Sequence, residues 1–266
     1  MNILVEIQKM YSSFSDKEKL IADFILQQKE NINNISITEL AVKTKTSPAT
    51  ITRFCKKIGC QSFVEMKISI NKITTDNDEE NEGSVFSDMY HYYNEVIKRT
   101  KELIDKRDIY NFINELKKAR KIYIYGVGSS GISAWEMMQR LLRMGFNVQS
   151  VTDPHMMIIT SAIVSDKDLV IGISTSGKTK AVLKSLRLCK KNKSKIVTIT
   201  GFENTEMTKL SDINFLVYNT FFIDKERFIN SQFSIMYLLD LICTVLLQDK
   251  NIRSIFKRTV NAIISN

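Results

Sequence analysis

Two segments of the chain have the glycine spacing of phosphate-binding loops. The first, Gly126-Val-Gly-Ser-Ser-Gly131, has the GxGxxG spacing that binds dinucleotides, and Asp153 follows about where an acid would bind the ribose. The second, Gly172-Ile-Ser-Thr-Ser-Gly-Lys-Thr179, has the GxxxxGK(S/T) spacing of a P-loop, which binds nucleoside triphosphates. A small sheet with both sites would be unusual, so at least one of the two matches is accidental.

A third interpretation joins the two segments in a single site. Both are rich in hydroxyls expected at the start of a helix: Ser129 and Ser130 in the first, and Ser174, Thr175, Ser176 and Thr179 in the second. Hydroxyls and backbone N–H groups from two helix starts can bind one phosphate without a metal ion. A P-loop also needs an acid for Mg²⁺, and neither strand expected after it ends in one; Asp224 is a weak candidate. The residues alone leave the three alternatives open.

From Arg120 onward, short β-rich runs alternate with stretches of helix length. Strands are expected at Ile122–Tyr125, Val148–Val151, Leu169–Ile173, Ile196–Thr200 and Ile213–Val217. Helices are expected at Ile132–Met144, Pro154–Val164, Thr179–Lys190 and Glu203–Leu210, with two more at 226–247 and 251–264. This alternation predicts crossover connections and a five-stranded parallel sheet with helices on both faces.

The amino-terminal region carries several helix-start signals. Ser15 is followed three residues later by Glu18, which is the capping-box pattern, and Ser36 is expected to cap the next helix. Ser47 and Pro48 then predict an N-cap and a first helical position, and Gly59 predicts the end of that helix. Two helices joined by a turn of this length form the helix-turn-helix pattern.

The second of these helices has two different faces. Its inner face is apolar, with Ile51, Phe54, Cys55 and Ile58. The other face and the turn before it carry small polar and basic residues suited to base edges and phosphates of double-stranded DNA: Thr46, Ser47, Ala49, Thr50, Arg53, Lys56 and Lys57. The alternative is a solvated basic face, because helix-turn-helix patterns also serve in protein contacts.

A segment without apolar side chains separates two parts of the chain. Residues 74–84 carry five acids and one glycine, so they predict a solvated linker. We therefore expect a helical domain at 1–74, an acidic linker at 75–88 and an α/β domain at 89–266, with helical structure at Asp88–Lys118. The net charges of the three segments are +4, −6 and +11. A basic excess permits nucleic-acid or phosphorylated ligands.

Composition excludes several classes of protein. With 44% hydrophobic and 25% charged residues, the 266-residue chain has an ordinary globular composition. No run approaches the roughly 20 apolar residues that cross a bilayer, and the start does not resemble a signal peptide. The four cysteines have no metal-ligand spacing and only two histidines accompany them, so we expect a reduced cytoplasmic protein with neither a metal nor a cofactor.

Two parts of the chain resemble domains of one known family. Gly126-Val-Gly-Ser-Ser-Gly-Ile-Ser-Ala134 and Ser174-Thr-Ser-Gly-Lys-Thr179, with Asp153-Pro-His155 between them, resemble the sugar-isomerase (SIS) phosphosugar-binding domain. Ser36-Ile-Thr-Glu-Leu-Ala41 and the segment from Ser47 to Gly59 resemble the helix-turn-helix of RpiR-type transcriptional regulators, which join these two domains in this order. The resemblance implies an all-α helix-turn-helix domain followed by an α/β SIS domain, a five-stranded parallel sheet flanked by helices. It favours the single-phosphate interpretation.

The resemblance also implies a function. It indicates a bacterial DNA-binding regulator of sugar or amino-sugar metabolism, a homodimer or a dimer of dimers, whose operator affinity is controlled by a sugar phosphate. The side chains of Ser130, Ser174, Ser176 and Thr179 would hold the phosphate, and Gly128, Ser129 and Thr175 would help through the backbone. Lys178 occupies a variable position and is not expected to be a ligand. His155 is expected to cap a helix or lie in an interface.

Catalysis is not expected. Sugar-phosphate isomerases need a carboxylate base over the reacting carbons. By the resemblance it would lie near the helix expected to begin around Phe228, where the chain has no acid; nearby Glu226 fits an exposed first-turn residue better. The family often has Ser-Arg here with a glutamine three residues on, whereas Ser231-Gln232 leads to Ile235, which affects sugar recognition. The alternative function is a sugar-phosphate isomerase with an accessory helical domain.

Overall fold

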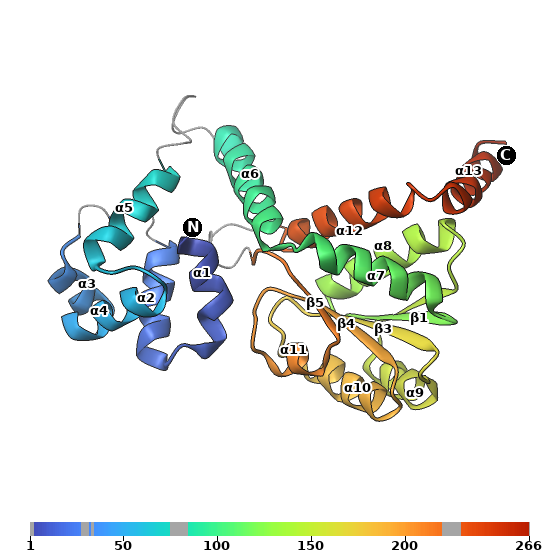
Figure 1. The fold of residues 1–266 in the computed structure, drawn as a ribbon, viewed down its shortest axis with the longest axis horizontal. Helices are drawn as coiled ribbons and strands as arrows, with labels where there is room; N and C mark the ends of the chain where they lie inside the picture. Colours follow the sequence, from blue (N-terminus) through green and yellow to red (C-terminus); the bar gives the residue numbers. More distant parts are fainter. Residues whose placement is uncertain (1–2, 28–31, 33–34, 75–84, 220–229, 266) are drawn as a thin grey trace. The chain divides into compact units, whose positions relative to one another are not determined.

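The computed structural model describes residues 3–27, 32, 35–74, 85–219 and 230–265 (Figure 1). The chain divides into two compact units. One comprises Met1–Arg99, Phe202–Asn204 and Tyr218–Ile229, and the other Thr100–Gly201, Thr205–Val217 and Asn230–Asn266. Among the described residues, every helix is too short or too polar to cross a membrane.

The first unit is helical. Its helices are α1 (Ile3–Met10), the 3₁₀ turn η1 (Tyr11–Ser13), α2 (Asp16–Gln27), α3 (Ile37–Lys43), α4 (Pro48–Lys57), α5 (Phe63–Thr74) and most of α6 (Val85–Leu103). Helix α4 contacts α2, α3 and α5. Its inner residues Ile51, Phe54 and Cys55 are fully buried, together with Leu40 of α3 and Met66 of α5. The apolar inner face predicted for this helix is therefore confirmed.

Local hydrogen bonds fix where these helices begin. The Ser36 hydroxyl accepts from the backbone N–H of Glu39 at 3.1 Å, and the Glu39 carboxylate accepts from the Ser36 N–H at 2.7 Å, so the cap predicted at Ser36 is a complete capping box. The Ser47 hydroxyl accepts from the Thr50 N–H at 3.2 Å. Gly59, just after α4, has φ of +88°, a conformation that favours glycine. The predicted turn and cap residues of the helix-turn-helix are thus confirmed.

The second unit is built on a five-stranded parallel sheet. Its strands are β1 (Lys121–Tyr125), β2 (Val148–Val151), β3 (Asp168–Ile173), β4 (Lys195–Thr200) and β5 (Ile213–Leu216), in the spatial order β2-β1-β3-β4-β5. All neighbouring pairs are parallel, which confirms the predicted sheet. Every residue of β3 is buried, as expected for a central parallel strand covered on both faces.

Helices cover both faces of this sheet (Figure 1). The helices are α7 (Lys106–Lys118), α8 (Ser129–Arg143), α9 (Pro154–Ile163), α10 (Lys180–Lys191), α11 (Glu206–Leu210), α12 (Phe233–Leu246) and α13 (Lys250–Ile264). One apolar core joins the sheet to α7, α8, α12 and α13, and a second joins it to α9, α10 and α11. The α/β architecture implied by the SIS resemblance is therefore confirmed.

Several helix boundaries differ from the expectation: α8 begins at Ser129 rather than Ile132, and α11 begins at Glu206 rather than Glu203. Helix α6 begins at Val85, inside the predicted acidic linker, and the stretch expected at 88–118 is two helices. They separate before Asp105, whose carboxylate accepts from the Arg107 N–H at 2.8 Å and so starts α7. Helix α12 begins at Phe233 rather than at 226. Residues 220–229, with Asp224, Glu226 and Phe228, lie outside the described residues, and the domain limits 1–74, 75–88 and 89–266 remain predictions.

Candidate functional site

The order of the strands reverses where both predicted phosphate loops begin. Strands β1 and β3 are neighbours, with Tyr125 opposite Gly172, but the chain moves from β1 to β2 on one side and from β3 to β4 on the other. Helix α8, which follows β1, and helix α10, which follows β3, consequently cover opposite faces of the sheet. Ligands of open parallel sheets bind at such a reversal, beyond the carboxyl ends of the strands.

The loop after β1 presents backbone N–H groups. Gly128 precedes α8 with φ of +59°, and its carbonyl accepts from the Gly131 N–H at 2.9 Å and the Ile132 N–H at 3.2 Å. The earlier N–H groups, those of Ser129 and Ser130, belong to the part of a helix that lacks intrahelical acceptors. Ser129 is exposed and Ser130 is almost buried. This geometry suits an anion at the start of α8.

Crowding requires glycine at the beginning of the same loop. A Cβ atom on Gly126 would clash with the backbone carbonyl of Ser130, and one on Gly131 would meet the Gly126 carbonyl and the Thr152 side chain at 3.0 Å. Close packing of β1 against the first turn of α8 therefore explains the outer two glycines of the GxGxxG spacing, and the positive φ of Gly128 explains the middle one.

The loop after β3 gathers hydroxyl groups. The hydroxyl of Ser174 lies 2.8 Å from that of Thr179 and 3.4 Å from that of Ser176. Ser174 is 2% exposed, and its backbone N–H donates to the Ile199 carbonyl of β4 at 3.0 Å. Three of the four side chains assigned to the phosphate by resemblance thus lie together, while Ser130 is on the neighbouring loop.

The first N–H groups of α10 have no side-chain cap. Thr179 is the N-cap residue, but its hydroxyl bonds to Ser174 and caps no N–H of α10. Gly177 has φ of +64°, and a Cβ there would lie 2.9 Å from the Thr205 side chain. The first turns of α8 and α10 contain no acid, so no carboxylate there competes with an anion for the positive ends of the two helix dipoles. Thr175, in the loop between β3 and α10, is half-buried, and its carbonyl accepts from the Gly201 N–H at 2.9 Å.

The nucleotide alternatives lack their partner residues in the described part of the chain. Asp153 caps α9, since its carboxylate accepts from the Met156 N–H at 2.8 Å. Strands β4 and β5 end at Thr200 and Leu216, so neither ends in an aspartate for Mg²⁺. Among the described residues, no group of three or more His, Cys, Asp or Glu side chains could hold a metal ion. His155 is exposed in the first turn of α9 and does not cap the helix.

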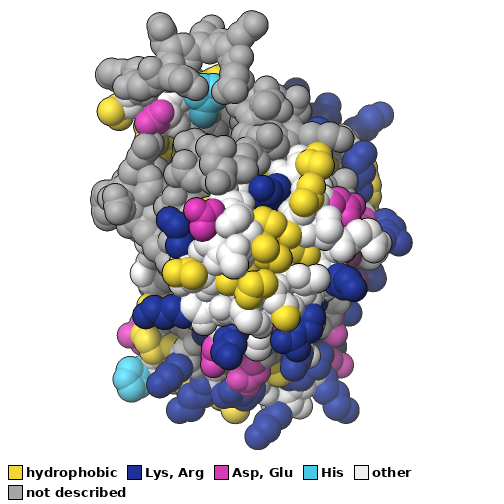
Figure 2. All heavy atoms as spheres, turned by 90° about the vertical axis from the view of Figure 1, so that its left-hand side faces the viewer, with side chains coloured by type: hydrophobic (Ala, Val, Ile, Leu, Met, Phe, Trp, Pro, Cys, Tyr) yellow, Lys and Arg dark blue, Asp and Glu magenta, His cyan; other side chains and the backbone are white. Residues whose placement is uncertain are grey.

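The predicted DNA-binding residues lie at and before the start of α4 and along its outer face. Ser47, Ala49, Arg53, Lys56 and Lys57 are exposed, and Thr46 and Thr50 are half-buried. Figure 2, viewed from the side of Figure 1 on which α3 and α4 lie, shows Lys and Arg side chains distributed over this face among hydrophobic ones. The Arg53 Nε–H donates to the Ala49 carbonyl at 3.4 Å, a contact within the same helix.

Lys57 differs from the other cations of α4. Its ammonium donates to the Glu18 carboxylate at 3.0 Å and to the Ser13 carbonyl at 3.2 Å, and it lies 5.2 Å from the centre of the Phe14 ring. Burial alone would raise the pKa of Glu18, but hydrogen bonds from Ser15 and Lys57 lower it below its ordinary value. Lys57 therefore helps to pack α4 on the start of α2, which its position on the outer face did not predict.

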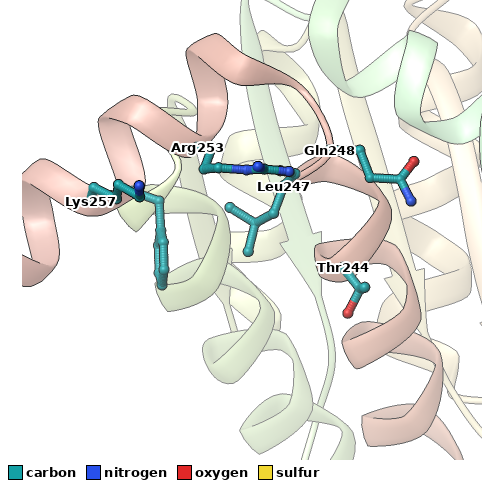
Figure 3. Close-up of a pocket in the computed structure, with 6 residues that line it drawn as sticks. Thr244, Leu247, Gln248, Arg253 and Lys257 are labelled. Carbon is teal, nitrogen blue, oxygen red and sulfur yellow. The ribbon is translucent and has the colours of Figure 1, made fainter.

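The described residues also form an open pocket of about 430 Å³ where α12 meets α13 (Figure 3). It is lined by Thr244, Leu247, Gln248, Arg253, Phe256 and Lys257. None of the predicted site residues lines it. Sequence reasoning did not single out Ser133, which binds the amide of Gln232 beside the first turn of α8; the only signal was the unusual Ser231-Gln232 pair.

Comparisons with known proteins match two separate parts of the chain. A model of the rpiR-family helix-turn-helix domain matches residues 1–76, and a SIS domain model matches residues 115–220. An uncharacterized HTH-type transcriptional regulator of Haemophilus influenzae is 29% identical over 99% of this chain and 96% of its own length.

Solved structures share the fold. The Vibrio vulnificus NanR protein, solved in complex with ManNAc-6P, has a TM-score of 0.63 at 23% identity and covers 99% of this chain and 98% of its own. The sugar isomerase domain of an RpiR transcription factor from Sphaerobacter thermophilus has a TM-score of 0.61 at 13% identity, covering 67% of this chain and 99% of its own.

The fold and the matched domains define a two-domain protein in which a DNA-binding helix-turn-helix precedes an α/β domain of the phosphosugar-binding SIS type. The Haemophilus influenzae relative aligns over nearly the full length of both chains. The chain thus carries an rpiR-family helix-turn-helix domain followed by a SIS domain, and it is similar over its length to HTH-type transcriptional regulators.

Proposed function

We propose that this regulator binds a sugar phosphate between the first turns of α8 and α10, and that the ligand alters its affinity for operator DNA. The observation that carries the proposal is the cluster of Ser174, Ser176 and Thr179 hydroxyls beside two acid-free helix starts. Seven residues would bind the ligand: Gly128, Ser129, Ser130, Ser174, Thr175, Ser176 and Thr179. Because the NanR structure of similar fold holds ManNAc-6P, phosphorylated amino sugars are the first candidates.

The regulation follows from linkage. A ligand changes DNA affinity only if it binds two arrangements of the protein with different affinities. The DNA would be contacted by Thr46, Ser47, Ala49, Thr50, Arg53, Lys56 and Lys57. This regulator would act in the cytoplasm, where both operator and sugar phosphate are found.

A homodimer would present two copies of α4 to DNA. Helix α9 exposes Met156, Ile159 and Ile163 at helical spacing, and α8 exposes Ile132 and Trp135. An exposed apolar face such as that of α9 is typical of an association surface, and α8 offers a second one on the other side of the sheet. Dimers, or dimers of dimers, would read half-sites separated by whole turns of DNA.

We also propose that the chain is not an enzyme. The described turn before α12 offers Asn230, Ser231 and Gln232, and no carboxylate that could move a proton between sugar carbons. Incubation with aldose and ketose phosphates should produce no interconversion. Measurable isomerisation at micromolar protein would favour the isomerase alternative.

A thermal-shift screen tests the ligand. The panel contains ManNAc-6P, glucose 6-phosphate, inorganic phosphate, Mg-ATP and NAD. Stabilisation follows RT ln(1 + [L]/Kd), so a ligand at a thousand times its Kd contributes about 4 kcal/mol. A shift with a sugar phosphate is expected. A shift with Mg-ATP alone would mean that the P-loop spacing reports the true ligand, and the proposal would fall.

A further inference from the structure

A buried amide links α12 to the first turn of α8. Gln232, the residue before α12, is 7% exposed. Its Oε1 accepts a hydrogen bond from the Ser133 hydroxyl at 2.8 Å, and its Nε2 donates to the Ser231 hydroxyl at 3.0 Å. Its backbone N–H donates to the Asn230 carboxamide oxygen at 2.8 Å. Both ends of the buried amide are therefore hydrogen-bonded, so its orientation is fixed.

Ser133 connects this amide to the predicted phosphate site. It is fully buried, one turn after Ser129, and its hydroxyl lies 3.4 Å from the Ser129 carbonyl. A hydroxyl has one proton, and the shorter distance to Gln232 makes the amide its acceptor. The turn so held contains the N–H groups of Ser129 and Ser130, which belong to the part of a helix that lacks intrahelical acceptors.

A second link between the same helices is more exposed. Arg140 of α8 pairs with Glu136 and with Asp240 of α12, whose side chain is 64% exposed. Solvent and salt screen such surface pairs, so they fix a helix weakly. The Gln232–Ser133 bond is shielded from water and lies at the end of α8 that would meet the ligand.

We propose that Gln232 is a positioning residue of the phosphosugar site, which acts through Ser133 to hold the first turn of α8 in its phosphate-binding geometry. This inference rests on the proposed function. Gln232 would not touch the phosphate. Its loss would lower the affinity for the phosphate group itself, because the displaced groups are the N–H donors of Ser129 and Ser130.

Calorimetric titration of the full chain with inorganic phosphate and with ManNAc-6P tests the proposal. Gln232→Met keeps the volume and removes both hydrogen bonds, and Ser133→Ala removes one of them. Each variant should bind both probes about tenfold more weakly than the parent, the scale of one lost buried hydrogen bond. The double variant should be no weaker than either single variant, because both changes break the same link. If Gln232→Met fails to fold, the affinity of Ser133→Ala for the two probes alone tests the proposal.

Thr198→Val is the matched control. The hydroxyl of Thr198, which is also fully buried, lies 2.8 Å from the amide oxygen of Asn214 within the sheet, so the variant loses the same type of bond. It should lower the melting temperature and leave both affinities unchanged. The inference would be overturned if Ser133→Ala bound the probes as tightly as the parent. It would also be overturned if the losses of the two single variants multiplied in the double variant, or if Thr198→Val lost as much affinity as they do. If the parent bound neither probe nor any sugar phosphate of the panel, the proposed function would fall as well.

Discussion

The two predicted binding regions are built in opposite ways. The phosphate loops lie at the ends of buried strands, and Ser174 is held by β4 and by neighbouring hydroxyls. The outer face of α4 consists of exposed side chains on a capped helix, of which Lys57 is attached to another helix by an ion pair. A ligand of the loops would meet groups already in place, whereas DNA would meet cations that must be ordered on binding.

This difference predicts how each region responds to change. Preorganised donors in a buried loop contribute strongly and specifically, because removing one leaves the others without an alternative arrangement. Exposed cations contribute smaller, salt-dependent amounts through phosphate contacts. Four substitutions test whether this contrast holds.

Ser174→Ala should cause the greatest loss. It removes the hydroxyl to which both Ser176 and Thr179 are hydrogen-bonded, so sugar-phosphate affinity should fall about 30-fold, within the range for bonds to charged groups. Calorimetry measures the loss, and operator affinity without ligand should stay at the parental value. An unchanged ligand affinity would remove the hydroxyl cluster from the site.

Arg53→Ala should have a smaller and different effect. We expect operator affinity to fall about tenfold and the slope of log K against log salt to decrease by about one phosphate contact. Fluorescence anisotropy with operator DNA at several salt concentrations measures both. Sugar-phosphate affinity should not change. Parental DNA binding by this variant would show that the outer face of α4 is not the DNA surface.

Asp168 begins β3, at the end of the strand opposite the loop that contains Ser174. Asp168→Asn tests an ion pair that contributes to stability and not to ligand binding. Burial would raise the pKa of Asp168, but the Arg120 guanidinium and the hydrogen bonds from Ser165 lower it below its ordinary value. The carboxylate therefore stabilises the fold above the unfolded-state pKa, about 4, and this contribution is lost as pH falls through the lowered value. The variant should unfold about 1–3 kcal/mol more easily at neutral pH. Its melting temperature should also decline less steeply between pH 5 and 2.5. A decline parallel to the parent's would contradict the assignment.

Lys57→Ala should have the smallest effect. The ion pair with Glu18 is partly exposed, so its loss should cost about 0.5 kcal/mol of stability, seen in urea denaturation. Because Lys57 is engaged within the helical unit, this change should reduce operator affinity less than Arg53→Ala does. An equal or larger loss of DNA binding would place Lys57 among the main DNA contacts and weaken the contrast between α4 and the loops.

Local signals explain which parts of the fold could be predicted. Capping boxes such as Ser36 with Glu39 depend on residues three apart, and the strands are continuous β-rich runs, so both were predictable from the sequence. The five-stranded parallel sheet followed from the alternation of strands and helices and from the resemblance, whereas the spatial order of its strands comes from the structure alone. The start of α12 was placed too early because apolar residues continue on both sides of the polar turn at Asn230–Gln232.

Contacts between residues far apart in the sequence could not be predicted. Lys57 with Glu18, and Ser133 with Gln232, are 39 and 99 positions apart, and no spacing rule connects them. The candidate ligand residues could be chosen because glycine and hydroxyl patterns are local. Which hydroxyls bond to one another, and which helix supports the first turn of α8, depends on tertiary packing.

The exposed Trp135 has a consequence of its own. It is the only tryptophan in the chain, and it lies on α8, six residues after Ser129, with 52% of its surface exposed. The indole emission of the unmodified protein therefore comes from this one helix. A water-exposed indole emits at long wavelength and is accessible to acrylamide, so quenching at increasing protein concentration would follow self-association through α8 without any attached label.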